Sequence, residues 1–276
     1  MYIPPELGAS FMNVIRPVYD GDYPDHEKLR AMWDIMCDMQ GVVLGQQLLR
    51  RIGSKVFAGP FRGMELSPAM IRGRVAPILL GTYEWELHDA IEAALAKPYK
   101  NVINVGCSNG YYAVGFAMRM PEAKIFAYDS DPEAQASCKE LAALNGAEDR
   151  VVIGGTFTGA EFEKFAGEET LVFMDVDTAE RELLDVERTP VLKNMDVIVE
   201  LHDCIVPALS TVLPFRFAPT HDVRVIPGAA FSFPLEKVMG SDYIANHFDN
   251  LLVTWEGRQS QTAFGVFNRK VEKTEG

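Results

Sequence analysis

The segment from residue 101 to residue 129 constrains the fold more than any other part of the sequence. A short β-rich run, NVINV at 101–105, opens directly into the loop GCSNG. An almost entirely apolar helical stretch follows, and a second β-rich run, KIFAY, ends at Asp129. A strand, a crossover helix and a second strand in this order predict two parallel strands with a right-handed connection. We therefore expect an α/β protein with a wound sheet.

The same alternation continues toward the C-terminus. Further strands are predicted at 151–153, 171–174 and 197–201, with a last pair at 222–226 and 263–267. Most of these runs are almost continuously apolar, which is typical of strands covered on both faces. The sequence thus predicts a doubly wound, mostly parallel sheet within a domain that spans residues 81–276.

Residues 1–80 lack this alternation and are predicted to be an N-terminal extension. Residues 1–25 are rich in proline, glycine and aspartate and are expected to form an irregular arm. Apolar side chains at near-helical spacing predict a helix over residues 26–53. The extension is expected either to pack against the main domain or to form a homo-oligomer.

Composition excludes several classes of protein. The 276 residues are 48% hydrophobic and 24% charged, which fits a soluble globular chain. The net charge of −13 and the lack of a basic stripe argue against nucleic-acid binding. Four scattered cysteines without a CxxC motif suit a reducing compartment. Since neither a secretory signal nor a membrane-spanning run is predicted, we expect a cytoplasmic enzyme without a membrane partner.

The loop after the first strand is the predicted ligand site. In open parallel sheets, ligands bind beyond the carboxyl ends of the strands, and an acid after the second strand can hold a ribose. Asp129 occupies that place, while Gly106 and Gly110 let the backbone turn tightly. A nicotinamide-binding fingerprint would need glycines where this chain has Ser108 and Tyr111. The pattern favours a phosphate-free nucleoside over a dinucleotide, and a glycine-rich turn without a ligand is the remaining alternative.

Four motifs resemble the FkbM-like branch of class I S-adenosylmethionine-dependent methyltransferases: VINVGCSNGYYAVGFA, FAYDSDPEA, LVFMDVDTAERELL and VIVELHD. The resemblance covers roughly residues 82–205 and implies a Rossmann-like, seven-stranded sheet whose last strand is antiparallel. It also implies S-adenosyl-L-methionine as the cofactor. The cofactor-binding residues would be Gly106, Cys107, Ser108, Gly110, Asp129, Ser130, Thr156, Phe157 and Asp175. The chain departs from the branch at residues 175–178, where Asp-Val-Asp-Thr stands in place of Asp-Val-Glu-Gly.

His202 is the predicted general base. Methyl transfer from a sulfonium mainly requires alignment of the reactants, but a hydroxyl acceptor must also lose its proton. His202 ends the fifth strand, at the same sheet edge as Asp175, and Asp203 or Glu200 could orient its ring. The predicted catalytic residues are therefore His202, Asp175 and Asp203. The expected reaction is O-methylation of a hydroxyl on a small molecule or a glycan.

Alternatives to this interpretation stay open. The chain could be a catalytically silent cofactor-binding or assembly domain, or an NAD(P)-dependent oxidoreductase. Asp175, Asp177, Glu200 and Asp203, together with His202, could hold Mg²⁺. Alternate residues of a strand point to opposite faces, however, so these acids need not converge, and no metal is expected.

Residues outside these motifs have weaker functional cases. The segment Thr82-Tyr83-Glu84 could reach over the methionine end of the cofactor, or simply begin a helix. His88 and His221 are expected to be structural. Three aromatic residues before the last strand are expected to belong to the core rather than to an acceptor pocket: Phe231, Phe233 and Trp255.

Overall fold

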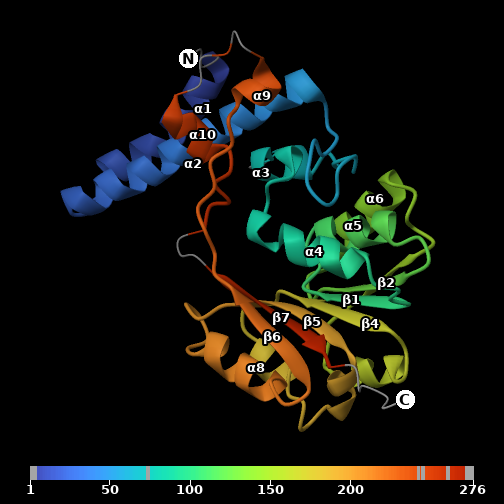
Figure 1. Cartoon of the computed structure of the whole chain (residues 1–276). Coiled ribbons are helices and arrows are strands. Elements are labelled where there is room, and N and C mark those ends of the chain that lie inside the picture. The colour runs from blue at the N-terminus through green and yellow to red at the C-terminus, as the bar shows by residue number, and fades with distance from the viewer. Residues whose placement is uncertain (1–4, 73–74, 241–242, 244–245, 259–261, 271–276) are drawn as a thin grey trace.

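The computed structural model describes residues 5–72, 75–240, 243, 246–258 and 262–270. Seven strands in this part of the chain form one sheet in the order β3-β2-β1-β4-β5-β7-β6 (Figure 1). The strands are β1 (Asn101–Val105), β2 (Lys124–Tyr128), β3 (Val151–Gly154), β4 (Thr170–Met174), β5 (Asp196–Leu201), β6 (His221–Ile226) and β7 (Ala263–Arg269). Neighbouring strands among β1 to β5 pair in parallel, and β7 runs antiparallel to both β5 and β6.

Helices cover both faces of the sheet, so the central strands are completely buried. On one face lie α4 (His88–Leu95), α5 (Tyr111–Arg119) and α6 (Pro132–Leu144), and on the other lies α8 (Leu209–Phe217) (Figure 1). Every residue of β1, β4 and β5 is buried. Two hydrophobic clusters result, one around Phe116 and the other around Phe217. The continuously apolar strands of the sequence therefore reflect burial on both faces.

Shorter helical segments complete the described chain. They are α3 (Ala76–Leu80), α7 (Glu180–Leu183), α9 (Glu236–Met239) and α10 (His247–Leu252), with 3₁₀ turns η1 (Met70–Arg72), η2 (Trp85–Leu87), η3 (Ala160–Phe165) and η4 (Pro190–Asn194). Within the residues that the structure describes, no helix is both long and apolar enough to cross a membrane.

The strand order and the antiparallel β7 confirm the predicted fold. Five parallel strands are wound outward from β1 in both directions, and the antiparallel pair lies beyond β5. This is the Rossmann-like arrangement of class I methyltransferases, preceded here by N-terminal helices. The order reverses between β1 and β4, and wound sheets bind their ligands at such a switch point.

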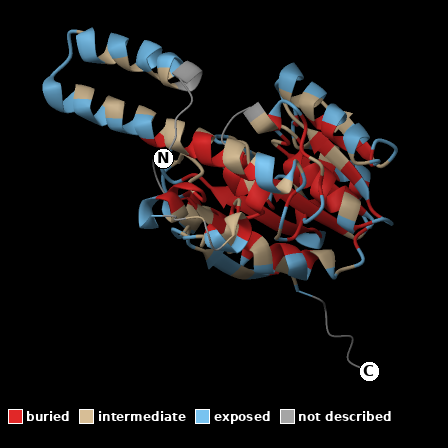
Figure 2. Ribbon diagram, turned by 90° about the horizontal axis from the view of Figure 1, so that it is seen from above, coloured by how far each residue is buried: buried red, intermediate tan, exposed pale blue. Residues whose placement is uncertain are grey.

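The N-terminal extension begins with a helical hairpin. Its helices are α1 (Pro5–Asp20) and α2 (Asp25–Ile52), and their connected ends project from the molecule with mostly exposed side chains (Figure 2). The expectation of an irregular arm is therefore wrong for the described residues. Phe11, Ile15 and Val18 are half-buried and recur at helical spacing. This apolar stripe outweighs the proline and glycine content.

The second half of α2 belongs to the core of the molecule. The helix predicted over residues 26–53 is confirmed, and its residues Leu44 and Leu48 are 2% and 0% exposed. Both lie in the same hydrophobic cluster as Val102 of the central strand. The extension thus shares a core with the face of the sheet that α4, α5 and α6 cover.

Candidate active site

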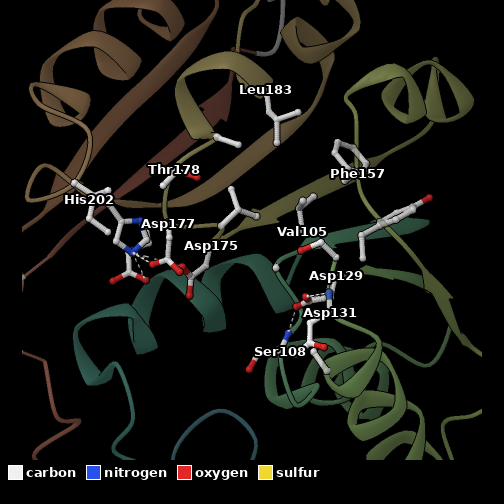
Figure 3. Close-up of a pocket in the computed structure, with 18 of the residues that line it drawn as sticks. Val105, Ser108, Asp129, Asp131, Phe157, Asp175, Asp177, Thr178, Leu183 and His202 are labelled. Atoms are coloured by element: carbon white, nitrogen blue, oxygen red, sulfur yellow. Dashed lines mark hydrogen bonds and ion pairs between the residues drawn. The ribbon is translucent and has the colours of Figure 1, made fainter.

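A cavity of about 840 Å³ opens at the carboxyl ends of the parallel strands. Its wall combines residues that follow four different strands: Gly106 after β1, Asp129 after β2, Asp175 after β4 and His202 after β5. In Figure 3 the loop and Asp129 lie at one end of the cavity, and His202 with its acidic neighbours lies at the other. The sheet thereby brings together side chains that are distant in the sequence.

The loop at residues 106–110 is shaped by close backbone packing. Gly106, Ser108 and Gly110 all have left-handed backbone, with φ of +79°, +47° and +91°. A Cβ atom on Gly106 would lie 1.6 Å from the carbonyl oxygen of Asp175, and one on Gly110 would lie 2.9 Å from the Cα of Cys138. Any side chain at either glycine would displace the backbone. The glycines therefore let the loop pack against β4 and α6.

Asp129 closes the loop end of the cavity. Its carboxylate accepts hydrogen bonds from the backbone N–H groups of Ser108 (2.8 Å) and Asp131 (2.9 Å). At the start of α5, the Asn109 side chain accepts a hydrogen bond from the N–H of Tyr111 (3.2 Å). These contacts occupy N–H groups that would otherwise bind a pyrophosphate, and they place a negative charge beside them. The loop is therefore poorly suited to a dinucleotide.

The surroundings of Asp129 fit S-adenosylmethionine. A carboxylate can accept about four hydrogen bonds, so Asp129 retains capacity for two ribose hydroxyls. Phe157 and Val105 supply an apolar wall for an adenine ring. Phe157 is held edge-on by Tyr128 and Phe162, at centroid distances of 4.9 and 4.8 Å. The acidic far end of the cavity suits the positive sulfonium.

His202 lies among four carboxylates. Its Nδ1 is 3.0 Å from Oε1 of Glu180, which is fully buried. Its Nε2 is 3.3 Å from Oδ1 of Asp177, 3.5 Å from Oε2 of Glu200 and 3.6 Å from Oδ1 of Asp175. The ring itself is buried, although it lines the cavity. Glu180 therefore orients the ring and directs Nε2 toward the other acids.

These carboxylates control the protonation of the ring. Burial lowers the pKa of His202, but the hydrogen bond to Glu180 and the charges of Glu200 and Asp175 outweigh it and raise the pKa to about 9. Burial, followed by the charge of Glu200, raises the pKa of Asp175 to about 8. The two groups titrate together, and His202 becomes a free base only on the alkaline side.

A second group of charges lies beside His202 and is called the Arg258 cluster here. The guanidinium of Arg258 forms ion pairs with Glu84, Glu200 and Glu256. Burial and the charge of Glu200 raise the pKa of Glu84, which is 1% exposed. The backbone N–H of Glu84 also donates to Oε1 of Glu256 (2.6 Å). The cluster connects β5 to the residue before η2 and to the segment before β7.

Most of the predicted site residues line the cavity: Gly106, Ser108, Asp129, Ser130, Thr156, Phe157, Asp175 and His202. Tyr83 of the segment before η2 also contributes to the wall. Cys107 and Gly110 do not, because the loop turns both of them toward Cys138 of α6. These two residues shape the loop from behind.

Asp203 does not orient the imidazole ring of His202, so that expectation is wrong. Its carboxylate accepts hydrogen bonds from the backbone N–H (2.9 Å) and the hydroxyl of Ser210 in the first turn of α8. Glu200 approaches Nε2 of His202 rather than Nδ1. Glu180 fills the predicted orienting role.

Sequence reasoning missed Glu180 and Arg258. Glu180 follows three other polar residues after β4, and nothing in its local pattern separates it from an acid at a helix start. Arg258 lies in a segment without a regular element, and its partners Glu84 and Glu200 are far away in the sequence. The signal in the sequence is Arg258 itself, a cationic residue two positions after Glu256 and shortly before the last strand.

Three side chains of the site also meet the spacing of a metal centre. Asp175, Glu200 and His202 each offer a ligand atom, and these atoms all lie within 4.8 Å of one another. The acids and the imidazole therefore converge, contrary to the argument from strand alternation. Oxygen and imidazole donors together suit a divalent cation. The expectation that no metal is used stays a prediction.

Comparison with known proteins gives short matches. No family model matches the chain. It is 36% identical over 76 residues to the release factor glutamine methyltransferase of Deinococcus radiodurans, a match that covers 28% of the chain and 27% of that protein. It is 34% identical over 59 residues to the 2-O-methyltransferase NoeI of Sinorhizobium fredii, which covers 21% of the chain and 24% of that protein. The chain thus spans about a quarter of the length of these curated relatives.

The search of solved structures gives matches at low sequence identity. The O-methyltransferase from Bacillus cereus in complex with SAH aligns with a TM-score of 0.44 and 10% identity, covering 95% of this chain and 99% of that one.

Proposed function

We propose that this chain is an S-adenosylmethionine-dependent methyltransferase of the FkbM-like branch, which methylates a hydroxyl oxygen with His202 as the proton acceptor. The observation that carries the proposal is the continuity of one cavity from Asp129 to His202. A cofactor bound at the nucleoside end and an acceptor bound at the proton-accepting end would therefore meet in the same cavity. The short matches to two methyltransferases support the same reaction class.

Each end of the cavity has a distinct task in this proposal. The bound cofactor supplies a methyl group already activated by the sulfonium. Asp129 holds the ribose hydroxyls, and Phe157 provides the wall for the adenine. Neutral His202 accepts the acceptor's proton at Nε2, because Glu180 binds the Nδ1–H. The nearby carboxylates stabilise the imidazolium that forms. Most of the remaining catalysis is alignment.

Calorimetry with S-adenosylmethionine and S-adenosylhomocysteine tests the first half of the proposal. Asp129→Ala is expected to weaken both affinities by about 10- to 100-fold, the effect of losing hydrogen bonds to a charged group. Glu122→Ala removes an exposed acid just before β2 and serves as the matched control. Circular dichroism checks that Asp129→Ala folds, since it also leaves two loop N–H groups without their acceptor.

A panel of hydroxyl acceptors tests the second half. Methylated product, detected as a gain of about 14 Da, is expected with the wild-type chain, and turnover should fall in His202→Gln. Cofactor binding without turnover on any acceptor would favour the silent-domain alternative. Binding of NAD(H) without binding of adenosyl sulfonium compounds would overturn the proposal.

A further inference from the structure

A second cavity of about 350 Å³ lies beside the first. The two cavities share three wall residues, Glu256, Arg258 and Thr262. The second cavity contains none of the predicted cofactor-binding residues. Its other walls come from the η2 region and from the segments around residues 228–231 and 251–255. It therefore adjoins the catalytic end of the active site, away from the cofactor end.

Aromatic side chains dominate the wall of this second cavity. Trp85 and Phe231 stack with a centroid distance of 5.0 Å and an interplanar angle of 30°, and Trp255 lines the same space. The indole N–H of Trp85 donates to the carbonyl of Ala229 (3.1 Å). The Thr254 hydroxyl donates to the carbonyl of Phe231. These bonds hold the Trp85 indole and the backbone that carries Phe231, so the cavity presents a preformed aromatic wall.

The charges around this surface select against anions. Glu86 and Glu256 contribute carboxylates to the wall, and Arg258 is the one lysine or arginine among the described residues that line either cavity. Its guanidinium nitrogens are already engaged by Glu84, Glu200 and Glu256. A phosphate or carboxylate would find no free cation and several negative neighbours. Hydroxyl groups, in contrast, can donate to the carboxylates.

We infer that the second cavity binds an uncharged ring with several hydroxyl groups, a sugar ring, that forms part of the methyl acceptor. The apolar face of the ring lies on the Trp85–Phe231 pair, and its hydroxyls donate to Glu86 and Glu256. The sugar ring thereby lies next to the wall residues that the second cavity shares with the cavity of His202. This inference rests on the proposed function and extends it to the class of acceptor. In this inference Phe231 and Trp255, which line the cavity, contact the acceptor, and the expectation that they belong to the core stays a prediction.

Nuclear magnetic resonance of the indole N–H groups can test the inference on the intact chain. Its three tryptophans are Trp33, Trp85 and Trp255, and tryptophan-to-phenylalanine variants assign their signals. The probes are the methyl glycosides of glucose, galactose and mannose, the methyl glycoside of glucuronic acid as an anionic counterpart, and phenol as a ring without a polyol. Trp33 packs against Phe248 on the hairpin side and serves as the internal control.

The Trp85 and Trp255 signals are expected to shift saturably with at least one neutral glycoside, while the Trp33 signal stays in place. The glucuronide should bind at least about tenfold more weakly, because a like charge meets the wall carboxylates. Trp85→Ala should weaken binding about tenfold, and Trp85→Phe should retain most of it. If Trp85→Ala does not fold, the wild-type titration and Trp85→Phe still decide the question.

Three results would overturn the inference: no saturable shift with any neutral glycoside, equal binding of the glucuronide, or a response to phenol alone. Titration of the same sample with S-adenosylhomocysteine keeps the proposed function separate. Glycoside binding without nucleoside binding would overturn the proposed function but keep the sugar site. Nucleoside binding without glycoside binding would overturn the sugar site but keep the proposed function.

Discussion

At the scale of single residues, the proposed reaction depends on how protons are distributed around His202. Its Nδ1 is bound to Glu180, and its Nε2 faces three further carboxylates. With a pKa of about 9, the ring keeps its proton at neutral pH in most molecules. The same charges favour the imidazolium that proton transfer creates. In the proposed reaction, the neutral form of His202 is thus a strong base, but at neutral pH only a small fraction of the molecules carry it.

Turnover is therefore expected to rise with pH and to level off above about 9. The neutral fraction of His202 increases about tenfold per pH unit below its pKa. His202→Gln should remove this dependence and lower kcat by about 10²- to 10⁴-fold, with unchanged affinity for S-adenosylhomocysteine. Initial rates between about pH 6.5 and pH 10 measure both effects. Glu182→Gln, an exposed acid of α7, should leave the profile unaltered. A flat wild-type profile would exclude the role of His202.

Chelation distinguishes this base from a metal centre at the same side chains. Because a protonated His202 already offsets part of the negative charge of Asp175 and Glu200, we expect dialysis against EDTA to leave turnover and cofactor affinity unchanged. Turnover is measured before dialysis, after dialysis, and again with added Mg²⁺ or Mn²⁺. Loss of activity that either ion restores would show that the three residues bind a metal instead.

His221 is expected to contribute to the acid sensitivity of the fold. The ring is 1% exposed, with Nε2 2.8 Å from the carbonyl of Met195 and Nδ1 2.8 Å from the Thr220 hydroxyl. Burial lowers its pKa, so the folded chain keeps the ring neutral. In the unfolded chain, His221 takes up a proton below about pH 6.5. Because the folded chain keeps the ring neutral, protonation favours the unfolded chain, and the free energy of unfolding decreases as the pH falls below this value.

His221→Gln should therefore lose less stability than the wild type between about pH 7.5 and pH 5. Urea unfolding at these two pH values gives both free energies of unfolding. His26→Gln is the control, because the His26 side chain is 82% exposed. An identical loss of stability in His221→Gln and in the wild type would contradict the argument.

At the scale of elements, the Arg258 cluster holds irregular segments to the sheet. Arg258→Met would leave Glu84 and Glu200, 1% and 3% exposed, without their cation. Breaking a buried pair in this way is expected to cost about 3 kcal/mol of unfolding free energy. Arg258→Lys should restore part of the loss. Arg188→Met removes a pair between an 80% exposed arginine and the half-buried Asp185, and it should cost below about 1 kcal/mol. Equal effects in a denaturant titration would show that the cluster adds no stability.

Elements and contacts differ in how far they could be predicted. The sheet was predictable because its central strands are local apolar runs, and the loop with Asp129 lies within one strand–helix–strand unit. The proline and glycine content of residues 1–25 conceals helix α1, whereas the spacing of Phe11, Ile15 and Val18 encodes it. The Arg258 cluster joins Arg258 to Glu200, 58 residues away, and to Glu84, 174 residues away, and no local pattern encodes such contacts.

At the scale of the whole molecule, the division at residue 80 does not separate two cores. Leu48 of α2 and Val102 of β1 are both fully buried in one hydrophobic cluster. The projecting half of the hairpin, in contrast, exposes side chains such as Leu29, at 65% (Figure 2). A shared core predicts that the extension and the sheet unfold together.

Leu48→Ala is therefore expected to destabilise the entire chain by about 2–5 kcal/mol, as a truncation in a packed core does. Leu29→Ala, the matched substitution on the same helix, should change stability by less than about 0.5 kcal/mol. Denaturant titrations followed by far-ultraviolet circular dichroism and by tryptophan fluorescence test both variants. In Leu48→Ala the two signals should move to one lower midpoint, because α2 shares its hydrophobic cluster with the central strand β1. Separate midpoints for the two signals would mean that the extension folds independently and that residue 80 marks a true domain boundary.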